Sequence, residues 1–193
     1  EGAWENSSNF SNSPRSRDKT IKRVKELPDP LKKILYYEYN GKDFAAHRQF
    51  ALDKVLEHDP DWYYKADADE IIHEDQVSNL LGIMKHEDVT CLSVTHKLFW
   101  NDLIHYETWG PIVRFFKLKD LKKDDIKLSS DPNILTCTSD QSYFRPYNVP
   151  VNVVEFYHPS YCKNTERQKL KWHHRSIEDK KPFPHIIHEN GLL

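Results

Sequence analysis

The chain has 193 residues, of which 38% are hydrophobic, 12% aromatic and 30% charged, a composition typical of a folded domain rather than a disordered chain. Its formal net charge of −2 creates no overall field that would favour nucleic acid or an anionic membrane. No apolar run approaches the ~20 residues that span a bilayer, so the sequence predicts no transmembrane segment.

The amino-terminal part of the sequence predicts a loop, two helices and one strand. Residues 1–17 are rich in Ser and Asn and have no periodicity, which is typical of a loop. A short helix is expected over 19–27, and an apolar, aromatic run predicts a strand at 34–37. The strongest helical pattern covers 43–57, where apolar residues form a broad face.

The rest of the sequence changes from alternating elements to a strand-rich pattern. An aromatic strand at 62–66 and a helix at 74–85 are followed by predicted strands at 89–99, 112–118 and 151–157. Residues 119–142 predict an irregular excursion, 164–175 a basic helix, and 176–193 a mobile tail. This order predicts one α/β domain over 1–193, with a mixed central sheet flanked by helices.

The cysteines indicate free thiols. Cys91, Cys137 and Cys162 are widely spaced and odd in number, which fits neither a disulfide framework nor a zinc site. Free thiols are typical of a reducing compartment, so we expect a cytoplasmic protein.

The most informative motif is Asp67-Ala68-Asp69-Glu70, directly after the strand predicted at 62–66. In extended backbone, residues two apart point to the same side, so Asp67 and Asp69 would converge on one hard cation. Carboxylates suit Mg²⁺ or Mn²⁺, which often share their coordination with substrate phosphates. The alternative is an ordinary turn with solvated acids, because Asp frequently ends strands.

Residues 61–72 (DWYYKADADEII) resemble the metal-binding segment of glycosyltransferases with the GT-A fold, in particular the family-two-like members. Looser similarity extends over about 1–175. It includes EGA at 1–3 with SRDKTI at 16–21, HRQFAL at 47–52 and YHPSY at 157–161. WGP at 109–111 with RFF at 114–116 resembles the acceptor-side strands of the family.

Two departures from that family pattern stand out. The chain begins without the strand and loop that hold the nucleotide base, so we expect it to lack the first βα unit of ~30 residues. Arg17 also stands where the family often has Asp. Both departures bear on nucleotide affinity and base identity.

The resemblance implies roles on the donor side of a site. Asp67 would contact the ribose or the metal, Asp69 would ligate the metal, and His158 would be a third ligand, which suits Mn²⁺ better than Mg²⁺. Arg48 and Lys65 are candidates for the diphosphate. Each of these residues also has a structural alternative. Arg48 would form an exposed ion pair on its helix, Lys65 would be a surface lysine, and His158 would be a structural histidine that ends a strand.

On the acceptor side, the resemblance calls for a carboxylate base and a surface for a sugar ring. Glu107, Asp102 and Glu70 are the candidate bases, with Glu107 favoured slightly. The aromatic candidates for a sugar platform are Trp100, Tyr106 and Trp109, for which core packing is the alternative. The basic residues of 163–175 would meet phosphates or an anionic membrane surface, although a solvated face is the default for such a run.

The resemblance therefore implies a metal-dependent glycosyltransferase. It would move a sugar from a UDP- or GDP-sugar donor to a hydroxyl of a glycan or another acceptor, with Mn²⁺ or Mg²⁺ as cofactor and no nucleic-acid partner. One alternative is a non-catalytic carbohydrate- or partner-binding module on the same scaffold. A metal-dependent phosphohydrolase is a weaker one, because such enzymes usually need more ligands than this stretch supplies.

Overall fold

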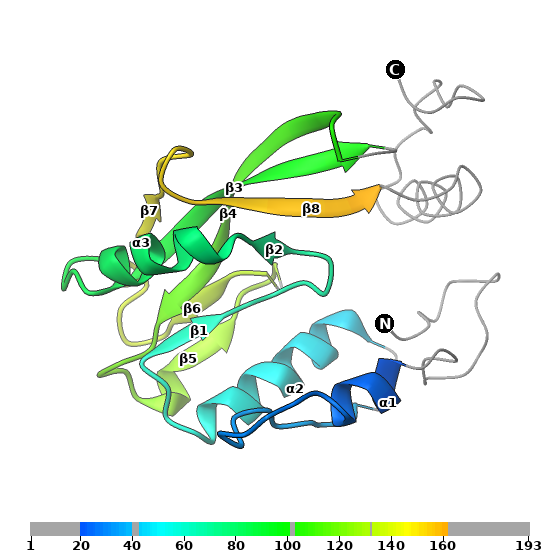
Figure 1. The fold of residues 1–193 in the computed structure, drawn as a ribbon. Helices are drawn as coiled ribbons and strands as arrows, with labels where there is room; N and C mark the ends of the chain where they lie inside the picture. The colour runs from blue at the N-terminus through cyan, green and yellow to red at the C-terminus, as the bar shows by residue number, and fades with distance from the viewer. Residues whose placement is uncertain (1–19, 40–42, 101–102, 132, 162–193) are drawn as a thin grey trace. The chain divides into compact units, whose positions relative to one another are not determined.

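The computed structural model describes residues 20–39, 43–100, 103–131 and 133–161 of the chain (Figure 1). The chain divides into two compact units, residues 1–58 and residues 59–193. The predicted loop at 1–17, the basic helix at 164–175 and the tail at 176–193 lie outside the described residues.

The first unit contains the two predicted helices, α1 (Thr20–Lys25) and α2 (Phe44–Leu56). Helix α2 begins after Asp43, whose carboxylate accepts a hydrogen bond of 2.6 Å from the amide of Ala46 and so satisfies one of the unpaired groups at the helix start. Leu52 and Leu56 lie one turn apart and are both buried. The capping residue and the apolar face of α2 are therefore both visible in the sequence.

The strand predicted at 34–37 is wrong, because these residues are irregular. The carboxylate of Asp29 accepts hydrogen bonds from the amides of Lys33, at 2.9 Å, and Ile34, at 2.6 Å. These two bonds hold the pKa of Asp29 below its usual range. The same Ile34 amide is therefore used by a local side chain instead of by a neighbouring strand.

The second unit is built on a mixed sheet. Among the described residues the strands follow the order β1-β4-β3-β8-β2, with β7 pairing with β3 beside that path. The long strands β3 (Cys91–Trp100) and β4 (Tyr106–Lys117) form an antiparallel hairpin, and β8 (Glu155–Tyr161) runs parallel to β3 (Figure 1). The shorter strands are β1 (Trp62–Tyr64), β2 (Ile71–Ile72) and β7 (Pro146–Asn148).

Several short elements were not predicted. Residues 119–142, expected to be irregular, contain the 3₁₀-helix η1 (Lys123–Asp125) and a two-stranded sheet of β5 (Ile126–Leu128) and β6 (Leu135–Cys137). Strands of two or three residues, such as β2 and β7, are too short for alternation to be recognised in the sequence.

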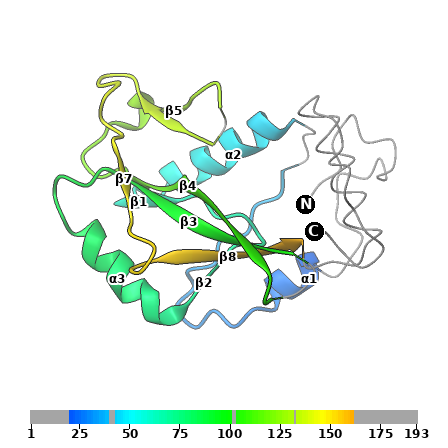
Figure 2. The ribbon, with the colours of Figure 1, turned by 90° about the horizontal axis from the view of Figure 1, so that it is seen from above.

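The core of the second unit lies between helix α3 (Glu74–Met84) and one face of the sheet, and Figures 1 and 2 show α3 beside the sheet. Leu80 of α3 packs in one buried cluster with residues of β3, β4 and β8. The strand members of this cluster are Leu92, Val94, Phe115 and Phe156. The predicted α/β class, with a mixed sheet and helices, is confirmed.

Two of the three cysteines lie among the described residues, and both are free thiols as predicted. Cys91 and Cys137 are buried, and burial raises the pKa of Cys91 to about 12. Cys162 lies outside the described residues.

Within the part of the chain that the structure describes, every helix is too short or too polar to cross a membrane.

The core of the second unit supports a matched test with two leucines. Leu92 is fully buried in β3, whereas Leu81 on α3 is 52% exposed. We expect Leu92→Ala to lower the free energy of unfolding by about 2–5 kcal/mol, because it removes buried apolar atoms and leaves a cavity. Leu81→Ala should change it by about 0.5 kcal/mol or less. Chemical denaturation measures both, and equal losses would contradict the described core.

Candidate functional site

The acidic motif forms a tight turn between β1 and β2. The amide of Glu70 donates to the carbonyl oxygen of Asp67 at 3.0 Å, which closes the turn. This differs from the extended backbone expected from the sequence. As a result, Asp67 and Asp69 engage different partners, Arg114 and His158 respectively.

The carboxylate of Glu70 is the buried centre of this turn. Its side chain is fully buried, and one oxygen, Oε1, pairs with Nη2 of Arg114. The same oxygen lies 3.2 Å from Nε2 of His96, which must carry the hydrogen because an ionised carboxylate only accepts. The other oxygen accepts the amide of Asp67 at 3.2 Å. Three donors therefore hold this one carboxylate.

Arg114 reaches the turn because it is the extra residue of a β-bulge. Leu92 lies opposite Phe115 and Ser93 lies opposite Val113, so Arg114 has no partner in the ladder between β3 and β4. A bulge re-aims a side chain that regular pairing would direct elsewhere. Nη2 of Arg114 also lies 2.9 Å from Oδ2 of Asp67. The resemblance placed Arg114 among the acceptor-side strands and did not connect it with the acidic motif, because nothing in a single sequence marks a bulge.

His96 was also missed, although a signal for it existed. It lies in β3 on the same alternation as Leu92, Val94 and Leu98, which are all buried. A histidine at a position expected to be apolar is a candidate for a buried polar contact. Its Nδ1, like Nε of Arg114, is a buried atom without a hydrogen-bond partner among the described residues.

The second aspartate of the motif faces β8. Oδ1 of Asp69 lies 3.5 Å from Nε2 of His158, and their side chains are 30% and 12% exposed. The ring centres of His158 and His96 are 6.3 Å apart. The contact between Asp69 and His158 therefore lies next to the contact between Glu70 and His96. The structure thus brings together Asp67, Asp69, Glu70 and His158, four of the residues that the sequence singled out.

This arrangement fits a divalent cation in part. Asp69 and His158 supply oxygen and nitrogen donors at a spacing that one ion can bridge after a small shift. Within the described residues, no three His, Cys, Asp or Glu side chains converge as a complete metal site. A cation held here would take its remaining ligands from substrate phosphates and water, which is common for Mg²⁺ sites.

The sheet places two acceptor-side candidates on the face that carries this site. In one row, Glu107 of β4, Leu98 of β3 and His158 of β8 lie opposite one another. In the next row, Trp109 lies opposite His96. Residues in one row point to the same face, and two strand spacings separate the ends of a row by about 10 Å. Trp109 is 43% exposed, so its ring is accessible.

Tyr106 lies on the opposite face of the sheet, away from the acidic turn. It pairs with Phe99, and the ammonium of Lys97 lies 4.8 Å from its ring centre. Lys97 also pairs with Glu155 at 2.7 Å. The three predicted aromatic platforms are therefore not one surface. Trp100 ends β3, and Asp102 lies outside the described residues.

Lys65 is buried rather than on the surface. It is 2% exposed, and its ammonium donates to the side-chain oxygen of Asn133 at 2.9 Å. Arg48 lies on α2 in the first unit, where it is half-buried. The contacts of both residues with a diphosphate stay predictions.

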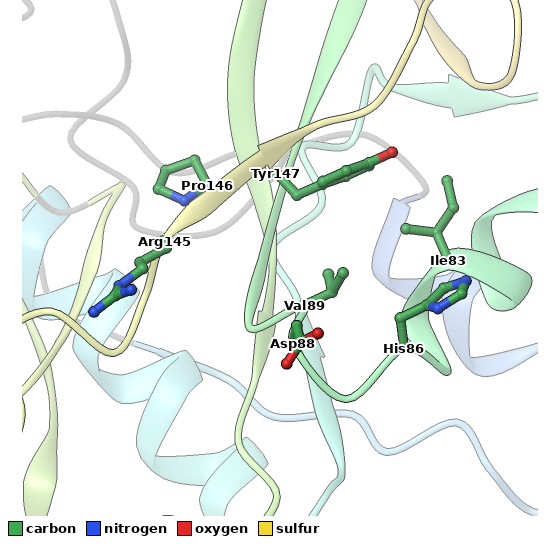
Figure 3. Close-up of a pocket in the computed structure, with 7 residues that line it drawn as sticks. All are labelled: Ile83, His86, Asp88, Val89, Arg145, Pro146 and Tyr147. Atoms are coloured by element: carbon green, nitrogen blue, oxygen red, sulfur yellow. The ribbon is translucent and has the colours of Figure 1, made fainter.

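A separate hollow of about 490 Å³ lies between the end of α3 and β7 (Figure 3). Figure 3 shows Tyr147 pointing toward the side formed by Ile83 and His86, whereas Arg145 points the other way. No residue of the acidic turn lines this open hollow, so it is distinct from the candidate site.

No protein-family model matches the sequence, and no curated protein is significantly similar to it. The resemblance to GT-A glycosyltransferases therefore rests on the sequence motifs quoted above.

The tyrosine that flanks the turn allows a test by pH. Tyr64 stacks on Phe115 with ring centres 4.5 Å apart. Burial raises the pKa of Tyr64 to about 12, with the charge of Glu70 adding to the rise and that of Arg114 opposing it. A phenol whose pKa is raised by folding stabilises the protein fully below its unfolded pKa of about 10, and this contribution is lost as the pH rises toward 12.

We therefore expect wild-type protein to lose more stability than Tyr64→Phe between pH 10 and pH 12. Denaturation midpoints measured across this window check the difference. Tyr147→Phe, which removes an exposed phenol on β7, is the matched control. An equal pH dependence in the two variants would contradict the described environment of Tyr64.

Removing the carboxylate of Glu70 tests the buried cluster itself. Glu70→Ala leaves the guanidinium of Arg114 with only one of its two carboxylate partners in a buried setting. We expect a loss of about 3–5 kcal/mol in the free energy of unfolding, the usual effect of breaking a buried ion pair. Glu87→Ala, at an exposed position before β3, should stay near wild type in the same denaturation experiment.

Proposed function

We propose that the chain is a metal-dependent glycosyltransferase, which transfers a sugar from a nucleoside-diphosphate donor to a hydroxyl group of a glycan or another acceptor. The observation that carries this proposal is the contact between Asp69 and His158. It joins the acidic motif after β1 to the late histidine in β8, although the two residues are 89 positions apart in the sequence. The resemblance implied this same pair as ligands of one ion.

On the donor side, Asp69 and His158 would hold Mn²⁺ or Mg²⁺, and Asp67 would complete the protein's part of the site. The ion would supply Lewis-acid stabilisation of the leaving nucleoside diphosphate. The surrounding residues favour an ordered site, because Asp67 is held by Arg114 and the turn is closed by its own backbone.

On the acceptor side, the geometry favours Glu107 as the base that takes the proton of the acceptor hydroxyl. Its carboxylate belongs to an exposed residue on the face of the sheet that carries His158. Glu70 is fully buried and already accepts from Arg114 and His96, which suits an anchoring role better than proton transfer. Trp109, on the same face, is available to pack against the C–H face of a sugar ring.

The second candidate is a non-catalytic carbohydrate-binding module. The observation that favours it is Trp109, which is 43% exposed and lies opposite His96 in the sheet, because an accessible aromatic ring can pack against a sugar without an ion. The two candidates differ in the role of Asp69. In the glycosyltransferase Asp69 would be a ligand of the ion, and in the binding module it would be a surface acid with no role in binding.

Thermal unfolding with Mn²⁺, with uridine diphosphate and with both together tests the proposal. If the ion and the diphosphate share one site, only the two ligands together should raise the unfolding midpoint strongly. At a hundredfold excess of ligand over its dissociation constant, the free energy of unfolding rises by about 2.7 kcal/mol. Guanosine diphosphate is tested in parallel, because the base is not specified by the sequence.

Asp69→Asn should abolish this joint stabilisation and any sugar transfer to an acceptor. Asp88→Asn, an exposed aspartate before β3, is the matched control and should retain both. A joint shift that survives Asp69→Asn would contradict the assigned ligand. Glycan binding that is unchanged by the substitution, in the absence of any nucleotide effect, would favour the binding module. Release of phosphate or nucleotide without an acceptor would indicate a phosphohydrolase.

A further inference from the structure

The loop that follows α1 in the first unit carries a dense group of exposed apolar side chains (Figure 1). Five large ones lie within residues 27–37, which we call the apolar loop: Leu27, Leu31, Ile34, Leu35 and Tyr37. Leu31 is 70% exposed and Leu35 is 55% exposed. Single exposed apolar residues are ordinary, whereas a group of them marks a surface that contacts a membrane or a protein.

The apolar loop has a defined conformation although its side chains are exposed. The carboxylate of Asp29 accepts hydrogen bonds from the amides of Lys33 and Ile34. The amide of Lys32 donates to the carbonyl oxygen of Asp29 at 3.1 Å. These local bonds fold the backbone into a turn that leaves the side chains of Leu31 and Ile34 exposed. A loop that is already ordered loses less conformational entropy when it binds.

Basic residues accompany the apolar side chains. Residues 20–39 contain five Lys or Arg against three Asp or Glu, whereas acids outnumber Lys and Arg in the whole chain by 30 to 28. Lys32 and Lys33 are exposed and stand between Leu31 and Ile34 in the chain. Neither lysine forms an ion pair among the described residues. Their charge is complementary to a surface that is negative on the outside and apolar beneath.

We propose that the apolar loop binds an anionic lipid surface. Its leucines enter the boundary between headgroups and acyl chains, and Lys32 and Lys33 contact lipid phosphates. Apolar side chains, aromatic residues and lysines on one element are the features of interfacial membrane binding, and Tyr36 and Tyr37 supply the aromatic part. Lysine is depleted at protein–protein interfaces, which favours a lipid surface over a protein partner.

This inference goes beyond the proposed sugar transfer and uses no residue of the acidic turn. Sedimentation of the full chain with vesicles tests it. One set of vesicles contains phosphatidylcholine and phosphatidylserine in equal amounts, and the other contains phosphatidylcholine alone. We expect binding to the mixed vesicles only, and weaker binding as salt is added, because ions screen exposed charges.

The apolar contribution is tested with two leucines of equal exposure. Leu31 is 70% exposed in the apolar loop, and Leu103 is 69% exposed in the second unit. We expect Leu31→Ser to weaken vesicle binding by about 5-fold or more, and Leu103→Ser to change it by less than about 2-fold, because only Leu31 enters the lipid.

The charge contribution is tested with two pairs of adjacent lysines. Lys32→Gln with Lys33→Gln is compared with Lys122→Gln with Lys123→Gln, an exposed pair in the second unit. We expect the first double variant to weaken binding by about 10-fold or more and the second by less than about 2-fold, because lysines act on lipid charges only close to the surface.

Wild-type protein that does not bind the mixed vesicles would overturn the inference, and so would equal losses in the matched variants. A wild-type dimer that Leu31→Ser converts to a monomer, measured by light scattering, would assign the apolar loop to a contact between two copies and would also overturn it. Circular dichroism establishes that each variant is folded. The joint effect of Mn²⁺ and uridine diphosphate on unfolding should be the same in all of them, so the proposed function is judged separately.

Discussion

The buried carboxylate of Glu70 is the constraint on which the geometry of the candidate site depends. A fully buried negative charge is tolerated only when donors surround it, and here Arg114, His96 and the amide of Asp67 supply them. These donors come from β3, β4 and the turn itself, so the carboxylate ties three parts of the second unit together. The position of Asp67 follows from this arrangement, because Arg114 and Glu70 both contact it.

The sheet separates two environments that look alike in the sequence. On one face, beyond the core covered by α3, lie His96, His158 and Trp109. On the other face, Lys97 lies near the ring of Tyr106 and pairs with Glu155. Because neighbouring residues of a strand point to opposite faces, a shift of one position decides whether a side chain lies on the site face. The face that carries the candidate site contains His96 and His158 at positions where the strand pattern alone would predict core residues.

Much of the fold follows from local signals in the sequence. Asp43 as the helix cap and the apolar face ending in Leu52 and Leu56 predict α2, and the aromatic run before Asp67 predicts β1. These signals are reliable because capping and periodicity act over a few residues. The strand expected at 34–37 does not form, and the cause is also local. The carboxylate of Asp29 accepts a hydrogen bond from the amide of Ile34, five residues away.

The sequence by itself determined the α/β class, the helices and the chemistry available after β1, because composition and short-range pattern encode them. Only the tertiary structure decided the partners of that chemistry. Arg114 reaches Asp67 through a bulge in β4, and His158 reaches Asp69 through the register of β8 with β3 and β2. Bulges and register depend on how distant strands pair, and no local propensity specifies that pairing.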